Sequence, residues 1–195
     1  MKISAYEKKE LLKAWLAVSL AFAILFSGGL GGLFSIKIIL SFVISAFTVG
    51  IGFLLHELAH KMLAIRYGCW AEFRSDNRML VFMIAVSFLG FVFAAPGAVM
   101  IHGNIDRVKN GKISAVGPLT NIILAILFFL GYSISTGAIN GIFSYGFMIN
   151  SWLAAFNMIP FWNFDGAKVF QWSRAVFGIM IGASALLVFF SQLAV

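Results

Sequence analysis

Two histidines and a glutamate in the first half of the chain are spaced so that they can bind a metal ion and activate water. His56, Glu57 and His60 form the pattern H-E-x-x-H within an apolar stretch that has a helical pattern. Residues four apart share one face of a helix, about 5–6 Å apart, so both imidazoles can bind one ion from the same side. Glu57 projects from about the same level and can take a proton from water. The pattern predicts metal-assisted hydrolysis; a structural zinc site or a chance cluster of buried polar residues is the alternative.

The composition is that of an integral membrane protein. Of the 195 residues, 62% are hydrophobic and only 11% are Asp, Glu, Lys or Arg, compared with about 25% in soluble domains. The length fits a single membrane domain over residues 1–195. An ionisable side chain at membrane depth costs about 2.5–3.5 kcal/mol on insertion scales. Three such groups within a short stretch therefore need a common reason, and a bound metal ion supplies one.

Five apolar stretches are long enough to cross a bilayer as helices, so the predicted fold is an all-α polytopic membrane protein. These stretches are residues 11–26, 36–67, 113–136, 142–159 and 169–195. Another apolar stretch, residues 79–100, is interrupted by Gly90 and by Ala95-Pro96-Gly97. On length alone it is a sixth crossing, and the alternative is a re-entrant or hairpin element.

The distribution of positive charge distinguishes these two topologies. If residues 79–100 cross the membrane, the 14 Lys and Arg residues divide eight to one side and six to the other. If residues 79–100 turn back, thirteen of them share one side and Lys37 is the exception. Because cytoplasmic loops are rich in Lys and Arg, we expect five crossings and one returning element in the cell membrane, with a cytoplasmic N-terminus. The net charge of +7 then reflects orientation rather than nucleic-acid binding.

A catalytic zinc ion usually has three protein ligands and keeps one position for water, so a third ligand is required. The candidates are His102, Glu72, Asp76, Asp106 and Asp165. All but Asp165 lie in polar loops, where a solvated side chain is the default interpretation. Asp165 follows Pro160, which disrupts a regular helix, and precedes Gly166, which permits unusual backbone angles. This pattern favours an unwound segment that turns Asp165 inward; the alternative is a helix-capping aspartate.

Three motifs together resemble the site-2 protease family of intramembrane zinc metalloproteases. They are His56–His60, Gly117-Pro118-Leu119-Thr120-Asn121, and Asn157-x-x-Pro160 followed by Asp165-Gly166. The resemblance covers the catalytic core, about residues 36–170. It implies that His56, His60 and Asp165 hold one zinc ion, that Glu57 activates water, and that the site opens towards the cytosol. It also implies cleavage of a peptide bond in a membrane-spanning substrate. A second proline usual between the last two motif parts is missing here, so the unwound segment is expected to be less rigid.

Asn121 and Asn157 lie within these motifs and are candidates to bind the substrate backbone or to stabilise the oxyanion. The alternative for each is an interhelical hydrogen bond, worth about 0.6–2 kcal/mol. Gly117-Pro118 can equally be a simple helix start, because proline is favoured in the first turn.

Two other functions are consistent with the same residues. A metal-ion transporter would use the two histidines, Glu57 and Asp165 as a transit site, but transporters often contain internal repeats and the sequence has none. A membrane scaffold with a vestigial structural site would not need Glu57 as a base. The expected partners are the lipid bilayer and a membrane-protein substrate with a transmembrane helix. Nucleic acid is not expected, and the oligomeric state is left open.

Overall fold

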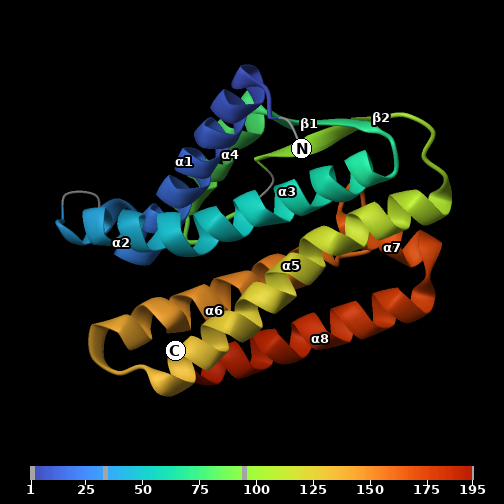
Figure 1. Cartoon of the computed structure of the whole chain (residues 1–195). Helices are drawn as coiled ribbons and strands as arrows, with labels where there is room; N and C mark the ends of the chain where they lie inside the picture. Colours follow the sequence, from blue (N-terminus) through green and yellow to red (C-terminus); the bar gives the residue numbers. More distant parts are fainter. Residues whose placement is uncertain (1–2, 33–34, 94–95, 195) are drawn as a thin grey trace. The chain divides into compact units, whose positions relative to one another are not determined.

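The structure is a computed structural model that describes residues 3–32, 35–93 and 96–194. The chain is mostly helical, as Figure 1 shows. It divides into two compact units. The first comprises Met1–Leu54 with Glu72–Met100, and the second comprises Leu55–Ala71 with Ile101–Val195.

Within the described residues, four helices are long and apolar enough to cross a membrane. They are Ala5–Ser27, Lys37–Arg66, Arg107–Ile134 and Arg174–Leu193. The prediction of an all-α polytopic membrane protein is therefore confirmed. The remaining expected crossing, residues 142–159, corresponds to helix α6 (Gly137–Asn157). Its 21 residues reach about 31 Å, but it is not apolar enough to be among the four, and Asn150 and Ser151 on it are fully buried.

The first unit is built around α1 (Ala5–Ser27), which packs against α2 (Lys37–Ser45) and α4 (Asn77–Ser87). A short 3-10 turn, η1 (Gly29–Gly32), follows α1. Helix α2 continues through a π-helical turn, η2 (Ala46–Gly50), into α3 (Ile51–Arg66). The Trp15 indole donates a hydrogen bond to the Ala46 carbonyl over 3.2 Å. A side chain at Gly50 would collide with that indole, so the glycine permits the close approach of α1.

The described part of residues 79–100 forms a short helix and a strand rather than one long helix. Helix α4 has 11 residues, which span about 16 Å, whereas the hydrocarbon core is about 30 Å thick. The strands on either side, β1 (Trp70–Ser75) and β2 (Gly97–His102), form a two-stranded sheet. They run antiparallel, because the Asp76 amide bonds the Pro96 carbonyl at one end and the Trp70 ring contacts the His102 ring at the other. The returning element that the charge distribution favoured is thus a short helix followed by a strand.

Two carboxylates at the start of α1 hold strand β1. Glu7 accepts a hydrogen bond from the Phe73 amide over 3.0 Å, and Glu10 accepts one from the Ser75 amide over 3.2 Å. Both carboxylates are buried, at 1% and 6% exposed. They satisfy backbone donors of β1 that its partner strand does not use.

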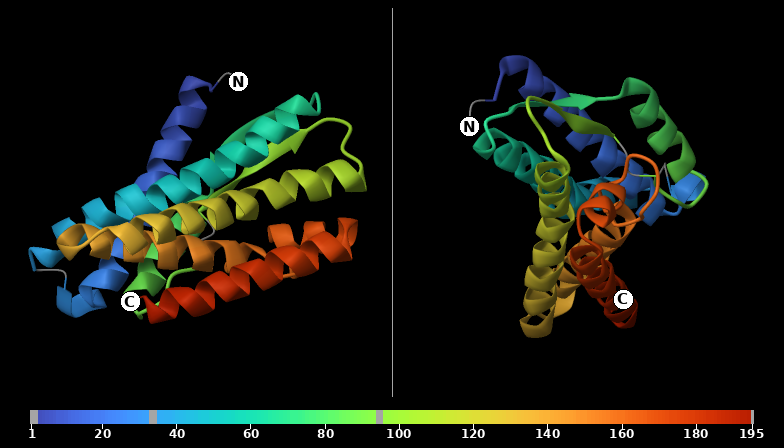
Figure 2. Two further views of the ribbon diagram at one scale, coloured as in Figure 1. Left: turned by 60° about the horizontal axis from the view of Figure 1, so that its bottom comes forward. Right: turned by 90° about the vertical axis from the view of Figure 1, so that its right-hand side faces the viewer.

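The second unit is a bundle of α5 (Arg107–Ile134), α6, α7 (Asp165–Trp172) and α8 (Arg174–Leu193), seen from two further sides in Figure 2. Its core contains small and flexible apolar side chains from all four helices: Ala115, Ile122, Ala154, Met158, Val169 and Met180. Helix α5 begins at Arg107, where Asp106 accepts a hydrogen bond from the Lys109 amide. Pro118 therefore lies inside α5, and the interpretation of Gly117-Pro118 as a helix start is wrong.

Candidate metal centre

The two histidines of the motif lie on one face of α3 and turn one nitrogen each towards the other. His56 Nε2 and His60 Nε2 are 3.0 Å apart. The ring planes are nearly perpendicular, at 81°. Both side chains are buried, at 5% and 7% exposed. The i, i+4 spacing thus places two potential ligand atoms side by side.

Asp165 completes a cluster of three donors. Its Oδ2 lies 3.3 Å from His56 Nε2 and 3.0 Å from His60 Nε2. In the parts of the chain that the structure describes, these three residues form the one group of His, Cys, Asp or Glu side chains close enough to share a metal ion. The structure therefore brings the third residue to the histidines from more than a hundred positions away.

The segment between α6 and α7 positions this carboxylate. Trp162 has a φ of 49°, in the left-handed region that is uncommon for residues other than glycine, and it lies in the turn between the two helices. Helix α7 begins at Asp165, and its N-cap is Phe164, so Asp165 is not the capping residue. Gly166 does not have the unusual backbone angles expected of it. Its role is close packing, because a Cβ there would lie 2.3 Å from the Met158 carbonyl oxygen.

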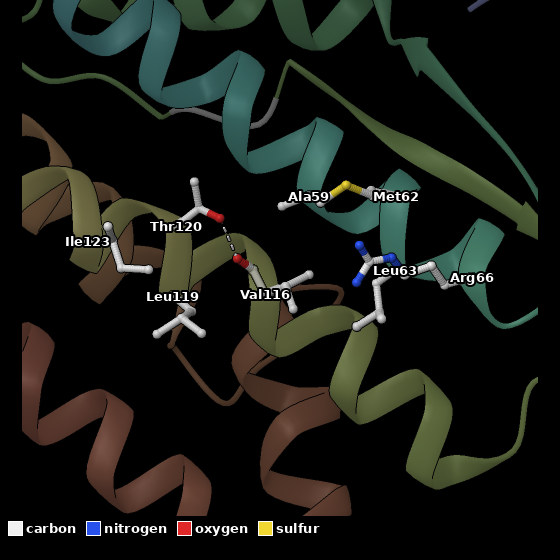
Figure 3. A pocket seen from close by; sticks show the side chains of 8 residues that line it. All are labelled: Ala59, Met62, Leu63, Arg66, Val116, Leu119, Thr120 and Ile123. Carbon is white, nitrogen blue, oxygen red and sulfur yellow. Dashed lines mark hydrogen bonds between the residues drawn. The ribbon is translucent and has the colours of Figure 1, made fainter. Parts of the chain in front are cut away.

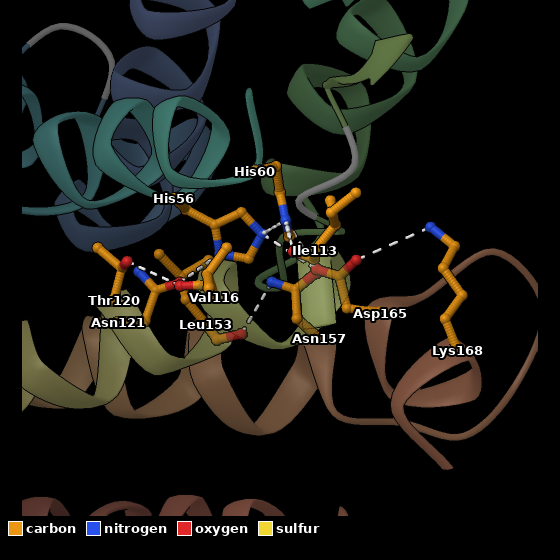
Figure 4. A network of polar contacts seen from close by, with 10 residues as sticks. All are labelled: His56, His60, Ile113, Val116, Thr120, Asn121, Leu153, Asn157, Asp165 and Lys168. Atoms are coloured by element: carbon orange, nitrogen blue, oxygen red, sulfur yellow. Dashed lines mark hydrogen bonds and ion pairs between the residues drawn. The ribbon is translucent and has the colours of Figure 1, made fainter. Parts of the chain in front are cut away.

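The second nitrogen of each imidazole is held by a carbonyl oxygen, as Figure 4 shows. His56 Nδ1 lies 2.6 Å from Asn121 Oδ1, and His60 Nδ1 lies 2.6 Å from the Ile113 backbone oxygen. Because both oxygens are acceptors, each Nδ1 must carry the proton in these hydrogen bonds. The lone pairs of the two Nε2 atoms then face the cluster.

The donor set and its spacing fit a zinc ion. Two imidazole nitrogens and a carboxylate oxygen are common zinc ligands, and three protein ligands leave one position for water. Tetrahedral ligands about 2.0–2.1 Å from zinc stand about 3.3 Å from one another, close to the 3.0, 3.0 and 3.3 Å between these donors. Three lone-pair atoms this close repel one another unless a cation binds them.

Space beside the nitrogens is kept free by Gly117 of α5. A Cβ at this position would lie 2.3 Å from His60 Nε2 and 2.6 Å from His56 Nε2. A carbon atom cannot approach the ligand atoms so closely, so any side chain here would displace the imidazoles. The glycine at the start of the Gly117–Asn121 motif is therefore required for steric reasons.

The two oxygens of the Asp165 carboxylate have different neighbours. Oδ2 faces the two histidine Nε2 atoms. The other oxygen, Oδ1, lies 3.8 Å from the Lys168 ammonium, which is 37% exposed. The lysine thus faces the oxygen that does not face the histidines.

The remaining predicted site residues lie in different surroundings. Glu57 follows His56 on α3 and is buried, at 8% exposed. Asn121 is fully buried and makes the interhelical bond to His56 described above. Asn157 is half-buried at the end of α6, near Asp165 in Figure 4, and its amide donates to the Leu153 carbonyl of its own helix.

The other candidates for a third ligand have structural roles. Asp76 and Asp106 accept backbone hydrogen bonds at the starts of α4 and α5. Glu72 accepts a hydrogen bond from Ser4 and pairs with Arg74. His102 is exposed, and its ring lies against Trp70. These contacts account for each residue without a metal ion.

An apolar hollow of 220 Å³ lies between α3 and α5 (Figure 3). Its lining is mostly aliphatic: Ala59, Met62, Leu63, Arg66, Val116, Leu119, Thr120 and Ile123. Ala59 precedes His60, and Thr120 precedes Asn121. The hollow therefore adjoins, on both helices, the residues of the candidate centre.

Sequence reasoning missed Gly117, the Ile113 carbonyl and Asn150 as contributors to this site. Asn150 bonds Asn121 across 3.1 Å and is fully buried. For Asn150, the sequence offered one signal, a side-chain amide in the apolar stretch of residues 142–159. Such an amide indicates that a hydrogen bond is made but does not identify the partner.

The chain is similar to a curated protein of Methanocaldococcus jannaschii named "Putative zinc metalloprotease MJ0611". The two are 40% identical over 187 residues, which cover 92% of this chain and 93% of that protein. No protein-family model matches the chain, and no solved structure matches it. The similarity extends over nearly the whole length and includes the segments that carry the three donors.

Proposed function

The chain belongs to the family of the M. jannaschii protein named as a zinc metalloprotease, and from this we propose that it is an intramembrane zinc metalloendopeptidase of the site-2 protease type. Its proposed reaction is hydrolysis of a peptide bond in or near a transmembrane segment of a membrane-protein substrate. The observation that carries the proposal is the cluster of His56 Nε2, His60 Nε2 and Asp165 Oδ2. The helix that bears the two histidines, α3, also bears Glu57.

The proposed catalytic roles follow from the chemistry of these groups. Zinc, when bound by His56, His60 and Asp165, supplies Lewis acidity that polarises a carbonyl oxygen and makes water acidic near neutral pH. The Glu57 carboxylate accepts a proton from the attacking water and returns it to the nitrogen of the leaving amine. Asn121 holds the proton on His56 Nδ1, and the Ile113 carbonyl does the same for His60. Asn157 remains the better placed candidate for binding the substrate backbone.

The depth of the site supports a substrate within the membrane. Helix α3 ends at Arg66, so the two histidines lie about 9–15 Å from that end at 1.5 Å per residue. A peptide bond in a substrate helix is hydrogen-bonded and shielded by side chains, so the substrate must unwind locally before cleavage. We propose that the site opens towards the cytoplasm, because the returning α4 element leaves thirteen of the fourteen basic residues on one side.

The proposal is tested by metal analysis of the purified protein together with cleavage of a transmembrane peptide, with and without a chelator. We expect one zinc ion per chain and cleavage that the chelator abolishes. Glu57→Gln should retain zinc and lose at least about 10²-fold in rate, the lower end of the contribution of a general base. Glu72→Gln is the matched control, since Glu72 is equally buried but pairs with Ser4 and Arg74.

Two outcomes would contradict the proposal. Equal loss of zinc and cleavage in Glu57→Gln would make Glu57 a structural residue. Zinc uptake into liposomes that contain the protein, without any peptide hydrolysis, would instead establish a metal transporter.

A further inference from the structure

A chain of buried hydrogen bonds connects a backbone carbonyl of α6 to the ligand His56. The Asn150 amide nitrogen donates to the Gly146 carbonyl over 2.9 Å. Asn150 Oδ1 accepts from the Asn121 amide nitrogen over 3.1 Å. Asn121 Oδ1 in turn lies 2.6 Å from His56 Nδ1. Three helices, α6, α5 and α3, are thus linked through two asparagine side chains, both fully buried.

The Gly146 carbonyl fixes which group donates and which accepts in each of these hydrogen bonds. The Gly146 carbonyl can only accept a hydrogen bond, so Asn150 must present its NH₂ group to it and its oxygen to Asn121. Asn121 must then present its NH₂ group to Asn150 and its oxygen to His56. Because an amide oxygen only accepts, His56 Nδ1 must carry the proton, and His56 Nε2 is left with its lone pair. A flip of either amide would bring two acceptors or two donors together.

The two histidines are therefore controlled by different means. His60 is held by the Ile113 backbone carbonyl, which cannot rotate and needs no further support. His56 is held by an asparagine side chain, which can present either its oxygen or its nitrogen to the ring. The contact with Asn150 favours one of these orientations, because Asn150 Oδ1 accepts from the Asn121 NH₂ group.

We propose that Asn150 is a positioning residue that acts through Asn121 to keep His56 in the tautomer with the proton on Nδ1, so that Nε2 is ready to bind metal. The inference deepens the proposed function, since it rests on the metal-ligand role of His56. Groups that hold the second nitrogen of a metal-bound histidine typically change metal affinity about 10–100-fold when replaced. Asn150 acts one step further away, so we expect replacement to weaken zinc binding about tenfold.

The test compares Asn150→Leu with Ser151→Ala in the full-length protein. Leucine has the branching of asparagine but no polar atoms. Ser151 is the next residue on α6, is also fully buried, and donates to the carbonyl of Phe147 over 2.7 Å, but it has no place in the chain to His56. If zinc affinity depended only on the loss of any buried polar group from α6, both variants would lose affinity to the same extent.

The first readout is the tautomer of each histidine, from nitrogen-15 spectra of histidine-labelled, zinc-depleted protein at alkaline pH, where imidazole is neutral. The chain has three histidines, so the signals are few. We expect Asn150→Leu to shift His56 towards the tautomer with the proton on Nε2, while His60 stays unchanged. The second readout is zinc affinity by competition with a chelator, with about a tenfold loss expected in Asn150→Leu and none in Ser151→Ala.

The proposal is overturned if His56 keeps its tautomer in Asn150→Leu, or if His56 and His60 change together, which would indicate general loosening. If Asn150→Leu does not fold, Asn150→Ala takes its place. In the unmodified protein, His56 with its proton mainly on Nε2 would overturn the inference without any variant. The tautomer readout needs neither zinc nor cleavage. A protein that binds no zinc but still shows the His56 shift would therefore refute the proposed function, while the control of the His56 tautomer by Asn150 would stand.

Discussion

Replacement of Gly117 by alanine adds one methyl group and should weaken zinc binding at the candidate centre without unfolding the protein. The added Cβ would lie 2.3 Å from His60 Nε2 and 2.6 Å from His56 Nε2. Atoms of this kind essentially never approach a Cβ within 3.0 Å, and ordinary contact begins at 3.4 Å. The two nitrogens would therefore have to move by roughly 0.8–1.1 Å, whereas zinc–ligand distances tolerate only about 0.2 Å.

The imidazoles cannot move away without cost. His56 is hydrogen-bonded through its other nitrogen to Asn121, and His60 to the Ile113 carbonyl. Rotation of either ring breaks a buried hydrogen bond of 2.6 Å, at a cost of about 0.5–1.5 kcal/mol. We expect zinc affinity to fall more than about 100-fold, beyond the usual effect of removing a group that only orients a ligand.

The fold should survive this substitution. Gly117 lies inside α5, where alanine is favoured over glycine by about 0.5–1 kcal/mol. Helix content by circular dichroism should therefore stay the same while zinc binding, measured by competition with a chelator, is lost. Gly182→Ala on α8 is the matched control, because no atom lies within 4 Å of the added carbon. Zinc affinity in Gly117→Ala equal to that of the unmodified protein would refute the steric argument and the position assigned to the ion.

Two further predictions concern Asp165. Gly166→Ala should weaken zinc binding at least about tenfold and destabilise the protein by about 1–3 kcal/mol. The reason is that its Cβ would lie 2.3 Å from the Met158 carbonyl oxygen, which is backbone and cannot rotate away; chelator competition and thermal unfolding measure the two effects, and an unchanged affinity would contradict the packing role of Gly166. Asp165→Asn should abolish zinc binding. Lys168→Met should change the affinity less than about tenfold, because an ion pair at 3.8 Å with a lysine 37% exposed is worth at most about 1 kcal/mol. A larger effect at Lys168 than at Asp165 would contradict the assignment of the aspartate as the ligand.

Local sequence was enough to predict the helical part of the site. His56, Glu57 and His60 lie within one helix, and their relative positions depend on helix geometry alone. The crossing helices followed from hydrophobic length, since each stretch satisfies its own backbone hydrogen bonds. The count of basic residues favoured a returning element over residues 79–100, and the structure has a short helix and a strand paired with β1 there. The fifth expected crossing, α6, is long enough to span a membrane but is less apolar than the four candidate spans. It carries polar residues, among them Asn150 and Ser151, which are fully buried.

Contacts between segments distant in the sequence could not be predicted in the same way. The sequence favoured Asp165 among five candidates for a third ligand, and the structure places it beside the histidines, after the turn at Trp162 and with Gly166 packed against Met158. Asn121 had two possible roles, and its neighbours on α3 and α6 show an interhelical bond to His56. Gly117 looked like a helix start, yet it lies in mid-helix against the ligand nitrogens.

The sequence by itself thus determined which residues are candidates for the chemistry and which stretches are long and apolar enough to cross a membrane, because helix period, length and charge are properties of neighbouring residues. The tertiary structure added that Asp165 lies beside the histidines, that Gly117 leaves space at their Nε2 atoms, and that the Asn121 amide contacts His56 Nδ1. An apolar helix that contains one asparagine needs a hydrogen-bond partner for it, but only the packing of α3, α5 and α6 selects that partner.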